Sequence, residues 1–68
     1  MRTVQLRDES IRLGQFLKYA DLVDSGSDAR LVLGEGRVTV NGVVELRRGR
    51  KVMRGDVVDF AGSVVRVG

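Results

Sequence analysis

The chain has 68 residues, a net charge of +3, and neither cysteine nor histidine. A chain of this length folds as one domain, residues 1–68, and the missing residue types exclude disulfides, the common zinc sites and the usual nucleophile–base pairs. No apolar stretch approaches the roughly 20 residues of a membrane span, and no signal-peptide core follows Met1, so we expect a cytoplasmic protein without membrane contacts.

The first predicted elements are a weak strand and a helix. Thr3–Leu6 alternates weakly between polar and apolar residues, which indicates a short strand. From Ile11 to Ala20, apolar side chains recur at helical spacing, at Leu13, Phe16, Leu17 and Ala20. Either Asp8 or Ser10 would cap the N-terminus of this helix. Gly14 lowers its helix propensity by about 1 kcal/mol relative to alanine, so packing must hold the helix together.

A second short helix is predicted from Ser27 to Leu33. Ser25 or Asp24 would cap its N-terminus, and Gly34 or Gly36 would end it. The turn between the two helices is so tight that they must cross at a steep angle.

After Gly36 the period changes to that of strands. Arg37–Val40 and Val43–Leu46 flank Asn41-Gly42, which predicts a hairpin closed by a type I′ turn. This closure pairs Val40 with Val43 and Val38 with Glu45 on one face, and the pattern does not decide which face is buried.

Three further strands follow a charged loop at Arg47–Arg50. Their expected ranges are Val52–Met53, Val57–Phe60 and Val64–Val67, with turns at Gly55-Asp56 and Ala61-Gly62. The predicted fold class is therefore α+β, with two short N-terminal helices packed on a small, mostly antiparallel sheet of short strands.

The basic residues are concentrated in one part of the chain. Arg37–Arg54 contains six basic residues and one acidic residue, a net charge of +5, whereas the rest of the chain carries −2. A cluster of one sign favours an anionic partner. The alternative is a solvated loop whose arginines serve solubility, and charge alone does not choose between the two.

Catalysis has little support in the sequence. The serines have no evident base beside them, and no glycine-rich nucleotide motif is present. Asp56 and Asp59 could form a carboxylate pair or a magnesium site, but we favour a structural role, in which Asp56 accepts hydrogen bonds from backbone amides at its turn. We therefore expect no enzyme activity, no cofactor and no small-molecule substrate.

RNA is the anion that the residues favour. Arginine suits bidentate contacts with phosphates, and the N-terminus of the second helix offers free amides. Only Phe16, Tyr19 and Phe60 are aromatic, which argues against base stacking on a sheet of aromatic residues. Basic charge would suit DNA equally, but no helix is long enough to fill a major groove.

Four segments, in this order and spacing, resemble the S-four-type RNA-binding domain, also called the αL motif. The segments are LGQFLK (Leu13–Lys18), SGSDARLVL (Ser25–Leu33), GRVTVNG (Gly36–Gly42) and VMRGDVV (Val52–Val58). The resemblance covers about Ile11 to Val67 and is strongest to the small stand-alone bacterial members of the family.

The resemblance implies that the two helices and the hairpin form a surface for structured RNA, usually ribosomal RNA. The residues that it places on or beside this surface, with the basic cluster that extends it, are Arg12, Lys18, Arg30, Arg37, Arg47, Arg48 and Lys51. One departure concerns the second helix, where many members begin with Ser-Arg and this chain has Ser25-Gly26.

The expected function is a non-catalytic RNA-binding module that docks on ribosomal RNA or ribosomal particles, with ribosomal proteins as further partners. The alternative is a protein-interaction module on a ribosomal or RNA-modifying protein. Such a module needs an exposed apolar patch, and the sequence offers only Leu22, Val23 and Leu31 as obvious candidates.

Overall fold

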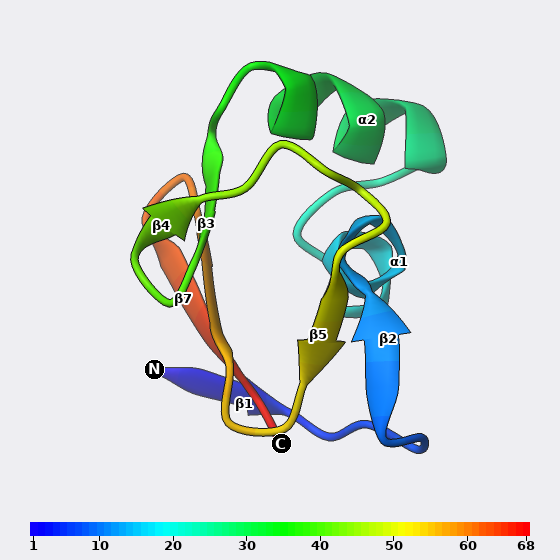
Figure 1. Cartoon of the computed structure of the whole chain (residues 1–68), viewed down its shortest axis with the longest axis vertical. Helices are drawn as coiled ribbons and strands as arrows, with labels where there is room; N and C mark the ends of the chain where they lie inside the picture. Colours follow the sequence, from blue (N-terminus) through cyan, green and yellow to red (C-terminus); the bar gives the residue numbers. More distant parts are fainter.

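A computed structural model describes residues 1–68 and contains seven strands and two helices (Figure 1). In chain order they are β1 (Arg2–Val4), β2 (Ser10–Arg12), α1 (Leu13–Tyr19), α2 (Gly26–Gly34), β3 (Val38–Val40), β4 (Val43–Val44), β5 (Lys51–Met53), β6 (Val57–Phe60) and β7 (Ser63–Val67).

The strands form two sheets. One has five strands in the order β1-β7-β6-β3-β4, in which only β1 and β7 are parallel, and the other pairs β2 with β5 antiparallel. Figure 1 shows the five-stranded sheet on one side of the molecule, α1 and the β2–β5 pair on the other, and α2 across one end. The α+β class is confirmed, whereas the prediction of a single sheet is wrong.

The predicted start of the first helix is also wrong. Ile11 and Arg12 belong to β2, where Ile11 pairs with Val52, and α1 begins at Leu13. Neither predicted cap acts on the helix. Instead, the N–H groups of Leu13 and Gly14 donate to the carbonyl oxygens of Arg50 and Arg48, at 2.8 and 2.9 Å. Two free amides of the first turn are thus satisfied by a loop more than thirty residues away in the sequence.

The second helix begins and ends as the local sequence indicates. Ser25 is its N-cap, and the Ser25 hydroxyl accepts a hydrogen bond from the Asp28 N–H at 3.1 Å. The helix ends at Gly34, and Gly36 follows with a φ of 71°. This left-handed conformation suits glycine and lets the chain turn into β3.

The Asn41-Gly42 hairpin has the predicted form. Asn41 and Gly42 have φ values of 53° and 83°, as a type I′ turn requires, and Val40 pairs with Val43. The structure also settles the question of the buried face, because Val38 and Val40 are buried.

Fifteen buried apolar residues form one core cluster between the helices and the sheets. The predicted helical stripe of Leu13, Phe16, Leu17 and Ala20 lies in this cluster, as does the apolar face of α2. The opposite side of α1 is therefore free to contact solvent or a ligand.

Candidate nucleic-acid interface

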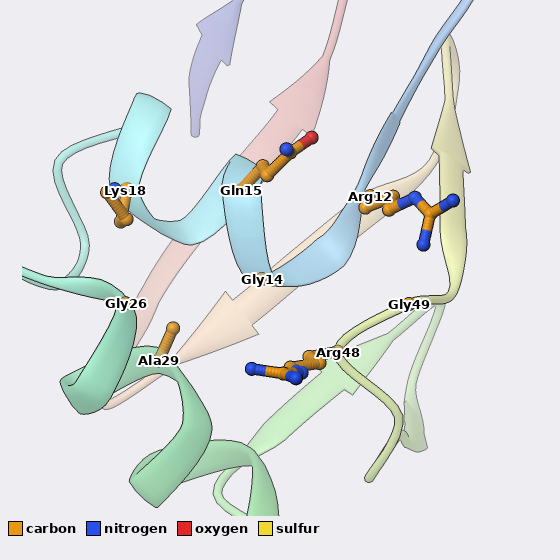
Figure 2. A pocket seen from close by; sticks show the side chains of 8 residues that line it. All are labelled: Arg12, Gly14, Gln15, Lys18, Gly26, Ala29, Arg48 and Gly49. Atoms are coloured by element: carbon orange, nitrogen blue, oxygen red, sulfur yellow. The ribbon is translucent and has the colours of Figure 1, made fainter.

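An open groove of about 380 Å³ lies between α1, the start of α2 and the loop that precedes β5 (Figure 2). We call it the basic groove. Its lining residues are Arg12, Gly14, Gln15, Lys18, Gly26, Ala29, Arg48 and Gly49.

Three of the seven predicted RNA-binding residues meet in the basic groove. Arg12 comes from the end of β2, Lys18 from α1 and Arg48 from the loop before β5. All three side chains are exposed, and none forms an ion pair or side-chain hydrogen bond within the protein. Three cations without an internal partner around one hollow create a positive potential there, which attracts anions.

Gly14 permits the close approach of the Arg48 loop to α1. A Cβ atom at position 14 would stand 3.1 Å from the Arg48 Cβ atom, closer than such atoms normally come. The absent side chain and the hydrogen bond from the Gly14 N–H together hold Arg48 against the helix. The sequence showed only the helix penalty of this glycine and not its role in the groove.

Lys51 extends the positive surface. In the β2–β5 pair, Arg12 lies directly opposite Lys51, and both side chains are exposed. Like charges placed opposite each other destabilise an antiparallel pair. An RNA phosphate between them would relieve this repulsion.

Arg47, in contrast, is held by an acidic residue of the same loop. Its backbone N–H and its guanidinium group both donate to the Glu45 carboxylate, and the Arg50 guanidinium also contacts this carboxylate at 3.1 Å. Glu45 is buried, with 8% of its surface exposed. The hydrogen bonds from Arg47 are the main reason why the pKa of Glu45 falls to about 2. The same partner raises the pKa of Arg47.

Arg37 and Arg30 lie outside the basic groove. Arg37 forms an exposed ion pair with Glu35 at 3.3 Å, and its guanidinium carbon lies 5.4 Å from the centre of the Phe60 ring. Arg30 is an exposed residue of α2 without an internal partner. The predicted set is thus divided between the groove (Arg12, Lys18, Arg48), its margin (Lys51), internal ion pairs (Arg37, Arg47) and the exposed face of α2 (Arg30).

Gly26 forms part of the groove wall at the start of α2. A Cβ atom at this position would meet nothing within 4 Å. Gly26 stands where many members of the resembling family have the arginine of a Ser-Arg pair. This position therefore has room for a larger side chain, which would begin at the wall of the basic groove (Figure 2).

The proposed structural role of Asp56 is confirmed. One carboxylate oxygen accepts from the Met53 N–H at 2.9 Å and the other accepts from the Asn41 side-chain amide at 3.0 Å. The Asn41 side chain in turn accepts from the Val57 N–H at 2.9 Å. These contacts join the Asn41-Gly42 turn to the turn before β6.

No group of three or more acidic side chains is placed to hold a metal ion.

Comparison with known proteins identifies the family. The sequence model of the family described as "S4 domain" matches residues 4–68, which is nearly the whole chain. The chain belongs to the S4 domain family. Curated relatives of this S4 domain include the "Probable ribosome maturation protein RlbA" of Bacillus subtilis (strain 168), 48% identical over 59 residues, which are 87% of this chain and 83% of RlbA. Another is YbcJ of Escherichia coli (strain K12), 39% identical over 57 residues, which are 84% of this chain and 81% of YbcJ.

Two solved structures share the fold. A solution structure of YbcJ from E. coli, described as revealing an αL motif involved in RNA binding, has a TM-score of 0.74 and 37% identity and covers 98% of this chain and 86% of YbcJ. The crystal structure of the 30S ribosomal protein S4e from Thermoplasma acidophilum has a TM-score of 0.74 and 28% identity, and covers 88% of this chain and 32% of S4e. The resemblance to small stand-alone αL proteins is confirmed.

Neither helix of this S4 domain is long and apolar enough to cross a membrane.

Proposed function

We propose that this S4 domain is a non-catalytic, cytoplasmic module that docks on structured RNA through the basic groove, and that its target is ribosomal RNA or a ribosomal particle. Arg12, Lys18 and Arg48 contact phosphates within the groove, and Lys51 extends the contact along the edge of the β2–β5 pair. Arg30 adds a further cation from the exposed side of α2.

The observation that carries the proposal is the gathering of Arg12, Lys18 and Arg48 around one hollow without internal partners. Two other arginines of the segment before β5, Arg47 and Arg50, are instead paired with the Glu45 carboxylate. The like charges of Arg12 and Lys51 repel each other at a cost in stability, and binding of a polyanion offsets that cost.

The ribosomal target is supported by two relatives. RlbA is named as a probable ribosome maturation protein, and the structure of S4e is that of a ribosomal protein. The structure of YbcJ is described in terms of RNA binding. The groove supports recognition of phosphates and shape, because it offers cations and glycine backbone and no aromatic side chain.

The salt dependence of binding to a structured fragment of ribosomal RNA tests this function. Four to six neutralised phosphates predict that log K falls against log salt concentration with a slope of about −3 to −5. An affinity that stays constant between low and moderate salt would contradict the electrostatic docking proposed here.

A second function, contact with a protein, is favoured by the outer face of the β3–β4 hairpin. Of the apolar residues expected from the sequence, Val23 is buried and Leu22 packs against the core, which leaves Leu31 exposed. Val44 and Leu46 are more than half exposed and lie beside Gly36.

We propose that a ribosomal protein contacts this face while the groove binds RNA. Val44→Ser should then weaken capture of ribosomal protein without changing the affinity for naked RNA.

A further inference from the structure

A second hollow adjoins the basic groove on the side of α1 that carries Tyr19. It has a volume of about 220 Å³ and shares Gln15 with the basic groove. Its lining residues are Leu6, Arg7, Asp8, Ser10, Ile11, Gln15 and Tyr19. A shallower depression lined by Ile11, Gln15, Lys18 and Tyr19 continues the surface toward Lys18. The side chains of one helix therefore connect the two hollows.

Tyr19 presents an aromatic ring in a fixed position. Tyr19 is 51% exposed, although it belongs to a helix whose other large apolar residues are buried. Its hydroxyl donates to the Gln5 carbonyl oxygen at 2.9 Å. This hydrogen bond holds the ring in place, so a flat ligand that stacks on it loses little additional side-chain freedom.

The polar groups of this hollow suit a neutral ligand better than a phosphate. Arg7 and Asp8 contribute charges of opposite sign, in contrast to the uniformly positive basic groove. The amide of Gln15 has no hydrogen-bond partner within the protein and points away from Arg48 in Figure 2. An amide both donates and accepts hydrogen bonds, which is the pairing that a nucleobase edge requires.

We propose that Tyr19, Ile11 and Gln15 bind one unpaired nucleobase of the RNA whose phosphates lie in the basic groove. The base stacks on the Tyr19 ring and packs against Ile11, while the Gln15 amide contacts its edge. Lys18 lines both the basic groove and the depression beside Tyr19, so it contacts the phosphate that joins this nucleotide to its neighbour. The inference rests on the proposed RNA-binding function and specifies it, because only loops, bulges and ends offer such a base.

The chain provides its own probe for this contact. Tyr19 is the sole tyrosine and tryptophan is absent, so the intrinsic fluorescence reports on this one position. The experiment uses two labelled RNAs, a hairpin with an unpaired loop and a blunt duplex of the same stem. Affinity is followed by anisotropy of the RNA label, and the tyrosine emission is followed in parallel with unlabelled RNA.

We expect the hairpin to bind more tightly than the duplex and to quench the tyrosine emission. Tyr19→Ala should weaken hairpin binding about 5- to 150-fold, the range found for stacked bases, and leave duplex binding unchanged. Tyr19→Phe retains the ring and should keep most of the hairpin affinity, whereas Tyr19→Leu retains apolar bulk without the ring and should lose it. Thermal melting of each variant checks that the fold is retained.

Two results would overturn the inference and leave the proposed function intact. One is binding of hairpin and duplex with equal affinity and no change in tyrosine emission. The other is a hairpin affinity of Tyr19→Ala within about twofold of the wild type. If the wild-type protein bound neither RNA at low salt, the proposed function and this inference would both be wrong.

Discussion

The Gly14 N–H donates to the Arg48 carbonyl oxygen at 2.9 Å, and the two residues come so close that a Cβ atom on Gly14 would lie 3.1 Å from that of Arg48. This contact places a basic residue of the loop beside α1 and forms one wall of the basic groove. The glycine that weakens the helix thereby helps to shape the binding surface.

Gly14→Ala should therefore lower the affinity for RNA. The added methyl group forces the Arg48 loop away from α1, and this strain opposes the gain in helix propensity of about 1 kcal/mol. Gly34→Ala is the matched control, because a Cβ atom there meets nothing within 4 Å. Urea unfolding should show a gain of up to about 1 kcal/mol for Gly34→Ala and a smaller gain or a loss for Gly14→Ala. Equal gains in stability and unchanged RNA affinity for both would contradict the proposed role of Gly14.

Arg47 and Arg48 are adjacent but should respond differently to replacement. Arg48→Ala removes a cation of the groove and should reduce the steepness of the salt dependence by about 1 without lowering the melting temperature. Arg47→Ala removes the principal partner of Glu45 and should lower the melting temperature, with the smaller effect on RNA affinity. Melting curves and anisotropy titrations at several salt concentrations separate the two effects. If Arg48→Ala lowered the melting temperature and Arg47→Ala reduced the salt dependence, the binding surface would lie on the other side of the loop.

The Glu45 carboxylate should make stability depend on pH in the acidic range. Its pKa falls from 4.5 to about 2 in the folded protein, so the folded state binds a proton less readily than the unfolded state. The stabilisation is complete above about pH 4.5 and is lost as the pH falls toward 2. Chemical unfolding between pH 2 and 6 should show this loss in the wild type and a weaker dependence in Glu45→Gln. Glu9→Gln changes the net charge equally at an exposed position and should retain the wild-type dependence.

Lys51→Glu should stabilise the protein and weaken RNA binding. The introduced carboxylate would lie opposite Arg12 and replace a repulsion by an attraction, a change of about 0.2–1 kcal/mol. The same substitution removes one cation from the margin of the groove and adds an anion. Thermal melting and RNA titration of the same sample would show the two effects in opposite directions. In an Arg12→Ala background the stabilisation should disappear.

Gly26→Arg should strengthen RNA binding. The position has room for a side chain, lines the groove and belongs to the first turn of α2. One added phosphate contact should steepen the salt dependence by about 1. Gly34→Arg adds the same charge at the other end of the helix, where it should have a smaller effect. Equal gains for both variants would indicate that net charge alone, and not the groove, determines the affinity.

The sequence was sufficient for the elements that depend on local interactions. The cap at Ser25 and the turn at Asn41-Gly42 act through neighbouring residues, so their identity and spacing predicted them. The division between β2 and α1 depends on pairing of Ile11 with Val52, forty-one residues later in the chain. Ile11 lies outside the apolar stripe, which begins at Leu13, and the local sequence carries no sign of the pairing with Val52, so Ile11 was wrongly included in the helix.

The candidate site was predictable in composition but not in arrangement. Arg47 and Arg48 look equivalent in the sequence. Only the fold shows that Arg47 is paired with Glu45, whereas Arg48 lines the basic groove. Arg12 and Lys18 lie at the two ends of α1, but Arg48 comes from the loop before β5, so no local pattern could bring Arg48 beside them. Gly14 and Gly49 were missed as groove residues, and a glycine inside an otherwise regular helix was the one available signal.

The glycine amides offer the most direct test of the basic groove as the RNA-binding surface. Gly14, Gly26 and Gly49 line the groove, whereas Gly42, Gly55 and Gly62 lie in turns outside it. In an NMR titration of the labelled protein with a structured fragment of ribosomal RNA, the backbone amide signals of the first three should shift or broaden, and those of the last three should stay in place. Shifts confined to Gly42, Gly55 and Gly62, with Gly14, Gly26 and Gly49 unchanged, would contradict the account.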